Sequence, residues 1–157
     1  FKTAPTDLKE PVRFISGGDL YHDEMESTAK MMRVAAKFNP LFSVLGGDLA
    51  YAFTSKKSEK EELDRWFNFL STYEKEMLTP EGVMIPLLPI LGNHDIRGGY
   101  LAGARNAKFF FTVFPMPGNL GYAHLDFGKW LSLLLLDSGH ANPVEGAQTA
   151  WLQKSLE

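Results

Sequence analysis

The segment SVLGGDLAYAF, residues 43–53, runs from a short apolar stretch through two glycines into an aspartate and a tyrosine. Considered by itself, this segment is an ordinary strand end, because glycines often end strands and an aspartate often caps the next helix. The same pattern occurs twice more: SGGDLYHD (16–23) closes the apolar run 12–16, and LGNHD (91–95) closes the run 84–91. Three strands that end alike indicate that their polar side chains serve a common site.

Two amphipathic helices are predicted between these strands. The first follows a capping-box pair, Asp23 and Glu26, and stops at residues 39–40, Asn-Pro. The second follows another such pair, Ser58 and Glu61. Apolar residues at three-to-four spacing form a stripe on each helix: Met25, Ala29, Met32 and Ala36 on the first, and Leu63, Trp66, Phe67, Leu70 and Tyr73 on the second.

The rest of the chain adds an antiparallel hairpin, predicted over 121–136, and a closing helix. Two prolines in the run 84–91 favour an edge position or an irregular entry for that strand, and residues 93–119 are predicted to be a long loop. The strand-helix-strand-helix-strand order predicts an α/β fold with a parallel core, which the hairpin joins. The closing helix, in 146–157, has apolar residues at Ala147, Trp151 and Leu152.

Composition narrows the class of protein. The chain has 157 residues, the length of one domain, and 45% of them are hydrophobic. It has no cysteine, so any metal site must use oxygen or imidazole ligands. A net charge of -3 gives no reason to expect a nucleic acid as a partner, and the longest apolar run, WLSLLLLDS, is too short to cross a membrane.

Metal-binding side chains gather at the predicted strand ends. The loops after the carboxyl ends of parallel strands converge on one edge, so a shared crevice is expected for Asp19, Asp48, Tyr51, Asn93 and one or two histidines. Clustered carboxylates repel unless a cation or a proton lies between them, and a phenolate particularly suits ferric iron. Asp48 is placed to bridge two ions, which would clamp the oxygens of a phosphoryl displacement.

These motifs resemble a known family. GGDLYHD (17–23), GGDLAYA (46–52) and LGNHD (91–95) look like the first three blocks of the calcineurin-like metallophosphoesterases, in the same order. The tyrosine of GGDLAYA is similar to the purple acid phosphatase branch, as are LLLLDS (133–138) and GAQTAWLQKSL (146–156). The resemblance implies a metallophosphoesterase-type α/β/β/α sandwich.

The resemblance also implies a metal set. Two ions are expected, with Fe(III) at the tyrosine and Fe, Zn or Mn as the second ion. Asp19 would bind the first metal and Asp48 would bridge, while Tyr51 would bind the ferric ion and Asn93 the second ion. A metal-bound hydroxide would be the nucleophile in the hydrolysis of a small phosphate monoester, diester or nucleotide.

His94 and Asp95 are the catalytic residues that the resemblance implies. His94 would donate a proton or hydrogen bond to the leaving oxygen, and Asp95 would tune it electrostatically. His22 and Arg97 are candidates for the wall of the pocket, although a surface position beside the helix cap is the simpler interpretation of His22. No nucleic acid or membrane partner is expected, and the frequent export of purple-phosphatase relatives favours a secreted or periplasmic location.

The later part of the family pattern is missing. The family has three further histidine ligands, two of them in Gly-His-x-His, whereas this chain offers only His94, His124 and His140 after Asn93. Residues 11–157 are therefore interpreted as the N-terminal portion of a metallophosphoesterase domain, incomplete for catalysis by itself. Residues 1–10 are interpreted as a linker or the end of a preceding fibronectin-like domain.

Two other interpretations stay open from the sequence. A short homologue that has lost catalysis could serve as a binding or interaction module, with the same fold. A doubly wound nucleotide-binding domain without metals would also fit the order of strands and helices. The second lacks support because the chain has neither a Gly-x-Gly-x-x-Gly loop nor a Walker-type lysine loop.

Overall fold

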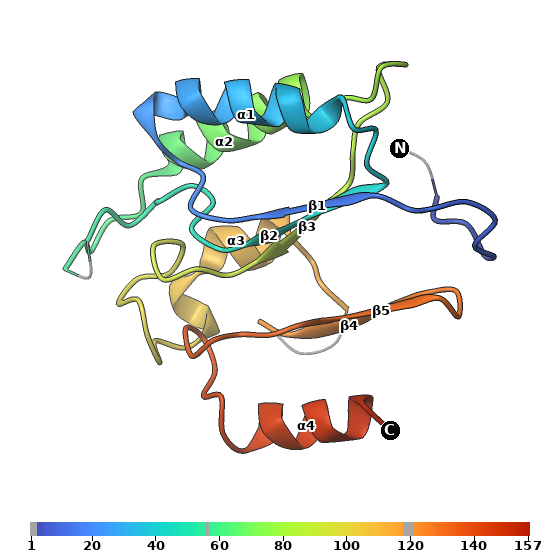
Figure 1. Ribbon diagram of the computed structural model, residues 1–157. Coiled ribbons are helices and arrows are strands. Elements are labelled where there is room, and N and C mark those ends of the chain that lie inside the picture. The colour runs from blue at the N-terminus through green and yellow to red at the C-terminus, as the bar shows by residue number, and fades with distance from the viewer. Residues whose placement is uncertain (1–2, 56, 118–120) are drawn as a thin grey trace.

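The computed structural model describes residues 3–55, 57–117 and 121–157. Figure 1 shows two helices on one side of a three-stranded sheet, then a two-stranded hairpin, and a last helix on the outer side of the hairpin. The strands are β1 (Phe14–Gly17), β2 (Phe42–Gly46), β3 (Leu87–Ile90), β4 (Ala123–Phe127) and β5 (Leu131–Leu135). The α-helices are α1 (Glu26–Ala36), α2 (Leu63–Glu76), α3 (Lys108–Val113) and α4 (Ala147–Ser155).

The three-stranded sheet is parallel, with the order β1-β2-β3. Phe14 of β1 pairs with Phe42, and Ser43 of β2 pairs with Leu87. The predicted α/β fold with a parallel core, an antiparallel hairpin and a closing helix is confirmed. β3 lies at an edge, as the two prolines predicted, since a proline cannot donate a hydrogen bond to a neighbouring strand.

The hairpin joins the sheet through aromatic contacts. The ring of Phe127 stacks on the ring of Phe42 with centroids 4.8 Å apart, which links β4 to the middle strand. At the hairpin turn, the indole nitrogen of Trp130 donates to the carbonyl oxygen of Pro5, 3.0 Å away. The N-terminal segment is therefore fastened to the hairpin.

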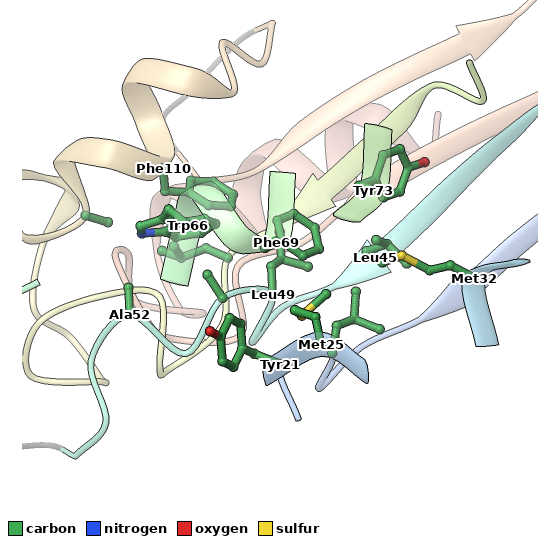
Figure 2. Packing of buried hydrophobic residues seen from close by; sticks show 14 of the residues in the cluster. Tyr21, Met25, Met32, Leu45, Leu49, Ala52, Trp66, Phe69, Tyr73 and Phe110 are labelled. Atoms are coloured by element: carbon green, nitrogen blue, oxygen red, sulfur yellow. The ribbon is translucent and has the colours of Figure 1, made fainter. Parts of the chain in front are cut away.

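The main core lies between the sheet and the helices α1 and α2. Figure 2 shows Trp66, Phe69 and Tyr73 of α2 packed against residues from α1 and the strands. The predicted stripe of α2 was partly wrong, because Phe67 is 57% exposed and Leu63 is also exposed, whereas Phe69 is fully buried. The helix is rotated so that residues 66, 69 and 73 face the core.

Neither predicted capping box forms. A 3-10 turn, η1 (Asp23–Met25), precedes α1, and no side chain caps either α1 or α2. The hydroxyl of Ser58 accepts from the backbone N–H of Ser55, 3.0 Å away. The carboxylate of Glu61 accepts from the indole nitrogen of Trp66 at 3.0 Å. Both side chains thus bind groups other than the backbone N–H groups of the first turn of α2.

Two further sequence predictions need correction. The stretch 93–119 contains a 3-10 turn, η2 (Ala104–Asn106), and α3, whose Phe109 and Phe110 pack near Trp66. Residues 118–120 of this stretch lie outside the described residues. On α4, Ala147 is exposed and Gln148 is buried instead. Among the helices that the structure describes, none has the length and apolar character needed to span a membrane.

Candidate active site

The loops that follow β1 and β2 are joined at the carboxyl edge of the sheet. The N–H of Asp19 donates to the carbonyl of Gly47 at 3.1 Å, and the N–H of Leu20 donates to the carbonyl of Asp48 at 2.9 Å. These two hydrogen bonds join the loops just past the ends of the strands and bring Asp19 and Asp48 to neighbouring positions.

The loops after β2 and β3 approach each other through two glycines. A Cβ atom on Gly47 would lie 2.7 Å from Cα of Gly92, and a Cβ atom on Gly92 would lie 2.0 Å from the nitrogen of Asp48. Only residues without a side chain permit this approach. It brings the backbone of the LGNHD motif against Asp48.

Three of the polar residues have left-handed backbone conformations. The φ angles are 53° at Asp19, 51° at Asp48 and 49° at Tyr51. Such angles are uncommon outside glycine and cost energy, so the surrounding structure must hold them. Strain of this kind is frequent at functional sites.

Asp19 and Tyr51 form a direct contact between two strand ends. The hydroxyl of Tyr51 donates to a carboxylate oxygen of Asp19 at 2.6 Å, across 32 residues of sequence. Burial first, and then this hydrogen bond and the nearby carboxylates, hold the pKa of the Tyr51 phenol well above its ordinary value. The phenol therefore keeps its proton next to the carboxylate.

Asp48 links the second strand end to the third. Its side chain is 8% exposed, and its Oδ1 accepts from the backbone N–H of His94 at 2.7 Å. Asn93, directly before His94, is half-buried, and the hydroxyl of Tyr100 donates to its Oδ1 at 3.4 Å. The structure thus brings Asp19, Tyr51 and Asp48 together with the Asn93–His94 segment.

His94 is fixed at both its ring and its backbone. Its Nδ1 lies 2.7 Å from the carbonyl oxygen of Phe53, and its ring stacks on the ring of Tyr51 with centroids 4.5 Å apart. A carbonyl oxygen can only accept, so Nδ1 carries the hydrogen. In the neutral ring Nε2 then holds the lone pair, and in the charged ring Nε2–H is a donor.

Asp95 is wholly buried and ties two loops together. Its carboxylate accepts from the backbone N–H groups of Leu49, Ala50 and Gly92 at 3.0, 3.2 and 3.3 Å. Burial raises the pKa of the Asp95 carboxyl to about 6, although these backbone donors oppose the change. These bonds hold the loop after β2 against the loop after β3, directly beside His94.

His22 and Arg97 lie outside this cluster of contacts. The side chain of His22 is exposed, and its Nε2 lies 3.4 Å from a carboxylate oxygen of Asp23. Arg97 is also exposed, and its Nε and Nη2 donate to Oδ1 of Asn106 at 3.1 and 3.0 Å.

The loop after β5 lies beside the segment that follows LGNHD, since the N–H groups of Leu101 and Ala102 donate to the carbonyls of Gly139 and His140. The sequence reasoning did not single out this strand end as a site. Asp137 follows β5 and is buried; its carboxylate accepts from the N–H groups of His140, Ala141 and Asn142. The loop that it shapes holds the buried His140, whose ring lies 4.9 Å from the ring of Tyr100. An aspartate directly after an apolar strand is the signal that could have indicated it.

The comparison with known families agrees with this arrangement. The family model for calcineurin-like phosphoesterases matches residues 13–154, which is most of the chain. The chain belongs to the calcineurin-like phosphoesterase family. Its members hydrolyse phosphoesters, so this phosphoesterase is a hydrolase that acts on phosphorylated substrates. No curated protein matches the chain.

Members of this family generally bind two metal ions, and the oxygen atoms of the cluster suit that use. In residues 3–55, 57–117 and 121–157, no group of three His, Cys, Asp or Glu side chains could hold an ion. The donors are instead two carboxylates, a phenol and an amide, a set that favours hard cations. Two oxygens that bind one ion at about 2.1 Å lie roughly 3 Å apart, close to the Asp19–Tyr51 separation.

Proposed function

We propose that this phosphoesterase hydrolyses small phosphate esters at a dinuclear metal centre held by Asp19, Asp48, Tyr51 and Asn93. The observation that carries the proposal is the contact between Tyr51 and Asp19, 2.6 Å between oxygen atoms from two strand ends. Oxygen donors crowded in this way repel when ionised, and a cation relieves that repulsion. The phenolic proton of Tyr51 now holds the two oxygens together, and a cation bound to both oxygens would take over that role.

The four ligands have different parts in this proposal. Tyr51 and Asp19 would hold ferric iron, because a phenolate suits that ion. Asn93 would hold the second ion, Fe, Zn or Mn. Asp48 would bridge, since its main-chain carbonyl binds the loop of Asp19 and its carboxylate binds the segment of Asn93. Two bound ions would lower the pKa of a water molecule and offset the negative charge of the phosphoryl group.

His94 is the proposed proton donor to the leaving group. The carbonyl of Phe53 holds Nδ1–H, so only Nε2 is free to face a substrate. Stacking on Tyr51 holds the ring beside one of the proposed metal ligands. Asp95 is a positioning residue in this scheme, because its carboxylate binds the loops on which His94 and Asp48 are built.

Hydrolysis of p-nitrophenyl phosphate with added iron, zinc or manganese tests this function. Because residues 11–157 are expected to be incomplete for catalysis by themselves, the test uses the intact protein that contains them, called the wild type below. We expect turnover in this wild type and a loss of about 100-fold or more in Asp48→Asn, with reduced metal content by elemental analysis. Asp64→Asn, at an exposed position on α2, is the matched control and should keep both the turnover and the metal content of the wild type. Phosphate-ester binding without turnover would refute the proposed hydrolysis and support the inactive binding module instead.

A further inference from the structure

A hollow lined in part by Phe53 lies next to the candidate active site, because the carbonyl of Phe53 also contacts His94. It has a volume of about 220 Å³. Three basic side chains line it, Arg97, Arg105 and Lys108, together with the carboxylates of Glu59 and Glu61. The basic residues come from the segment after LGNHD and the carboxylates from the segment before α2, which Figure 1 shows at one end of the molecule.

Phe53 connects this hollow with the candidate active site. It lines the hollow, and its carbonyl oxygen holds Nδ1 of His94 at 2.7 Å. Its N–H also donates to the carbonyl of His94 at 2.9 Å. One residue, Phe53, therefore links the imidazole of His94 to the hollow with the basic side chains.

The three basic residues do not form ion pairs with other side chains in the described part of the chain. Among the residues that the structure describes, none of them lies within a salt bridge. Arg97 is oriented by two hydrogen bonds from its guanidinium to the Asn106 side chain. Glu61 is engaged with the indole of Trp66. Three positive groups against two carboxylates leave one net positive charge, which suits a single additional anion.

We propose that this hollow is a subsite for a second anionic group, a phosphate or a carboxylate, on the substrate of the phosphoesterase. The proposal rests on the proposed function and narrows its substrates to organic phosphates with a second negative group several atoms from the scissile one. Guanidinium groups bind carboxylate and phosphate oxygens through paired hydrogen bonds, and Lys108 adds a point charge. Arg97, Arg105 and Lys108 are then specificity-determining residues.

Three phosphate monoesters of a four-carbon chain test the subsite, differing only at the far end: a hydroxyl, a carboxylate or a second phosphate. The measured quantity is kcat/KM for each anionic ester divided by kcat/KM for the hydroxyl ester, at constant ionic strength. We expect a ratio of about tenfold or more in the wild type for at least one anionic ester. The larger of the two ratios identifies the anion.

The double variant Arg105→Gln/Lys108→Gln should bring that ratio close to one. Both side chains are exposed, so the fold should persist, and thermal unfolding checks this. The double variant Lys37→Gln/Lys154→Gln removes the same charge at exposed positions on other elements and should keep the wild-type ratio. A wild-type ratio near one, or an equal ratio in both double variants, overturns the subsite.

Binding measurements separate this inference from the proposed function. A wild-type protein that hydrolyses none of the three esters overturns the proposed function. Calorimetric titration with the same esters then still tests the subsite. The wild type should bind an anionic ester more tightly than the hydroxyl ester, and Arg105→Gln/Lys108→Gln should lose this difference in affinity. Equal binding of all three esters to the wild type overturns the subsite as well.

Discussion

Gly92 and Asp48 are in such close contact that a Cβ atom on Gly92 would lie 2.2 Å from Oδ1 of the aspartate. The contact is between loops that follow different strands, and it sets the position of Asp48 relative to the segment Asn93–His94. A side chain at residue 92 must therefore move either the carboxylate or the backbone of one loop.

Gly92→Ala should lower hydrolysis by about 100-fold, because displacement of Asp48 by about 1 Å disturbs the whole ligand set. It should also lower the free energy of unfolding by about 1–3 kcal/mol through overpacking. Phosphatase kinetics and urea unfolding measure the two effects. Gly82→Ala is the control: φ is +75° there but no atom lies within 4 Å, so it carries backbone strain without a clash. Equal activity in both variants would contradict the prediction.

Tyr51→Phe should remove the colour of the iron-loaded protein. If Tyr51 binds ferric iron, charge transfer from the phenolate to the metal absorbs in the green, and a phenyl ring cannot supply it. Visible absorption after loading with ferric iron measures this. Tyr122→Phe, a buried tyrosine from a different part of the chain, should keep the band. A colourless iron-loaded wild type removes Tyr51 from the ligand set.

His94→Ala should reduce hydrolysis more for poor leaving groups than for good ones. An alkyl alcohol needs a proton as it departs, whereas p-nitrophenolate leaves without much help, so the loss should be about 100-fold or more with alkyl phosphates. The ratio of kcat/KM for the two esters, in the variant and the wild type, measures the effect. A uniform loss for both esters would indicate that His94 only shapes the pocket.

The stability of the protein should fall in alkaline solution through Tyr73. Burial raises the pKa of the Tyr73 phenol from 10.0 to about 12, and its hydroxyl lies 2.6 Å from that of Ser43 and 3.0 Å from the carbonyl of Ile85. The folded state holds the phenol neutral while the unfolded state ionises it. The stability is therefore fully present below pH 10 and is lost as the pH rises to about 12.

The size of this loss is about 2–3 kcal/mol, since one pH unit of difference in pKa is worth about 1.4 kcal/mol. About half of it, roughly 1.4 kcal/mol, should be lost between pH 8 and pH 11, and urea unfolding of the wild type and Tyr73→Phe at these two pH values measures this part. The variant should be less stable at pH 8, by about 1 kcal/mol for the lost hydrogen bonds, but should lose less on going to pH 11. A parallel decline of both proteins would contradict the assignment to Tyr73.

The arrangement of the strands could be predicted from the sequence because it depends on short patterns. Apolar runs that end in Gly-Gly-Asp or Gly-Asn-His-Asp identify parallel strands, and parallel strands deliver their last residues to one edge. The meeting of Asp19 with Tyr51, and of Asp48 with the N–H of His94, follows from that rule. The family match confirms the resemblance at the level of the calcineurin-like phosphoesterases.

The details that the sequence could not give depend on tertiary packing. A three-to-four apolar pattern with many aromatic residues leaves the buried face of α2 undecided between Phe67 and Phe69. Packing in the core between the sheet and the helices α1 and α2 buries Phe69. Gln148 is polar, yet it is buried because it binds both the N–H and the carbonyl of Asp137. Local patterns do not show a partner that comes from another loop.

The hydrogen bond from Trp130 to Pro5 joins residues 125 positions apart, so it closes a loop that contains most of the chain. Closing a loop of that length costs roughly 4 kcal/mol of chain entropy. The contact between Trp130 and Pro5 therefore becomes favourable only after the sheet between the two residues has assembled. The fluorescence of the Trp130 indole should accordingly report a late step of folding. This fluorescence should change after the signals of Trp66, which is fully buried in the core around α2.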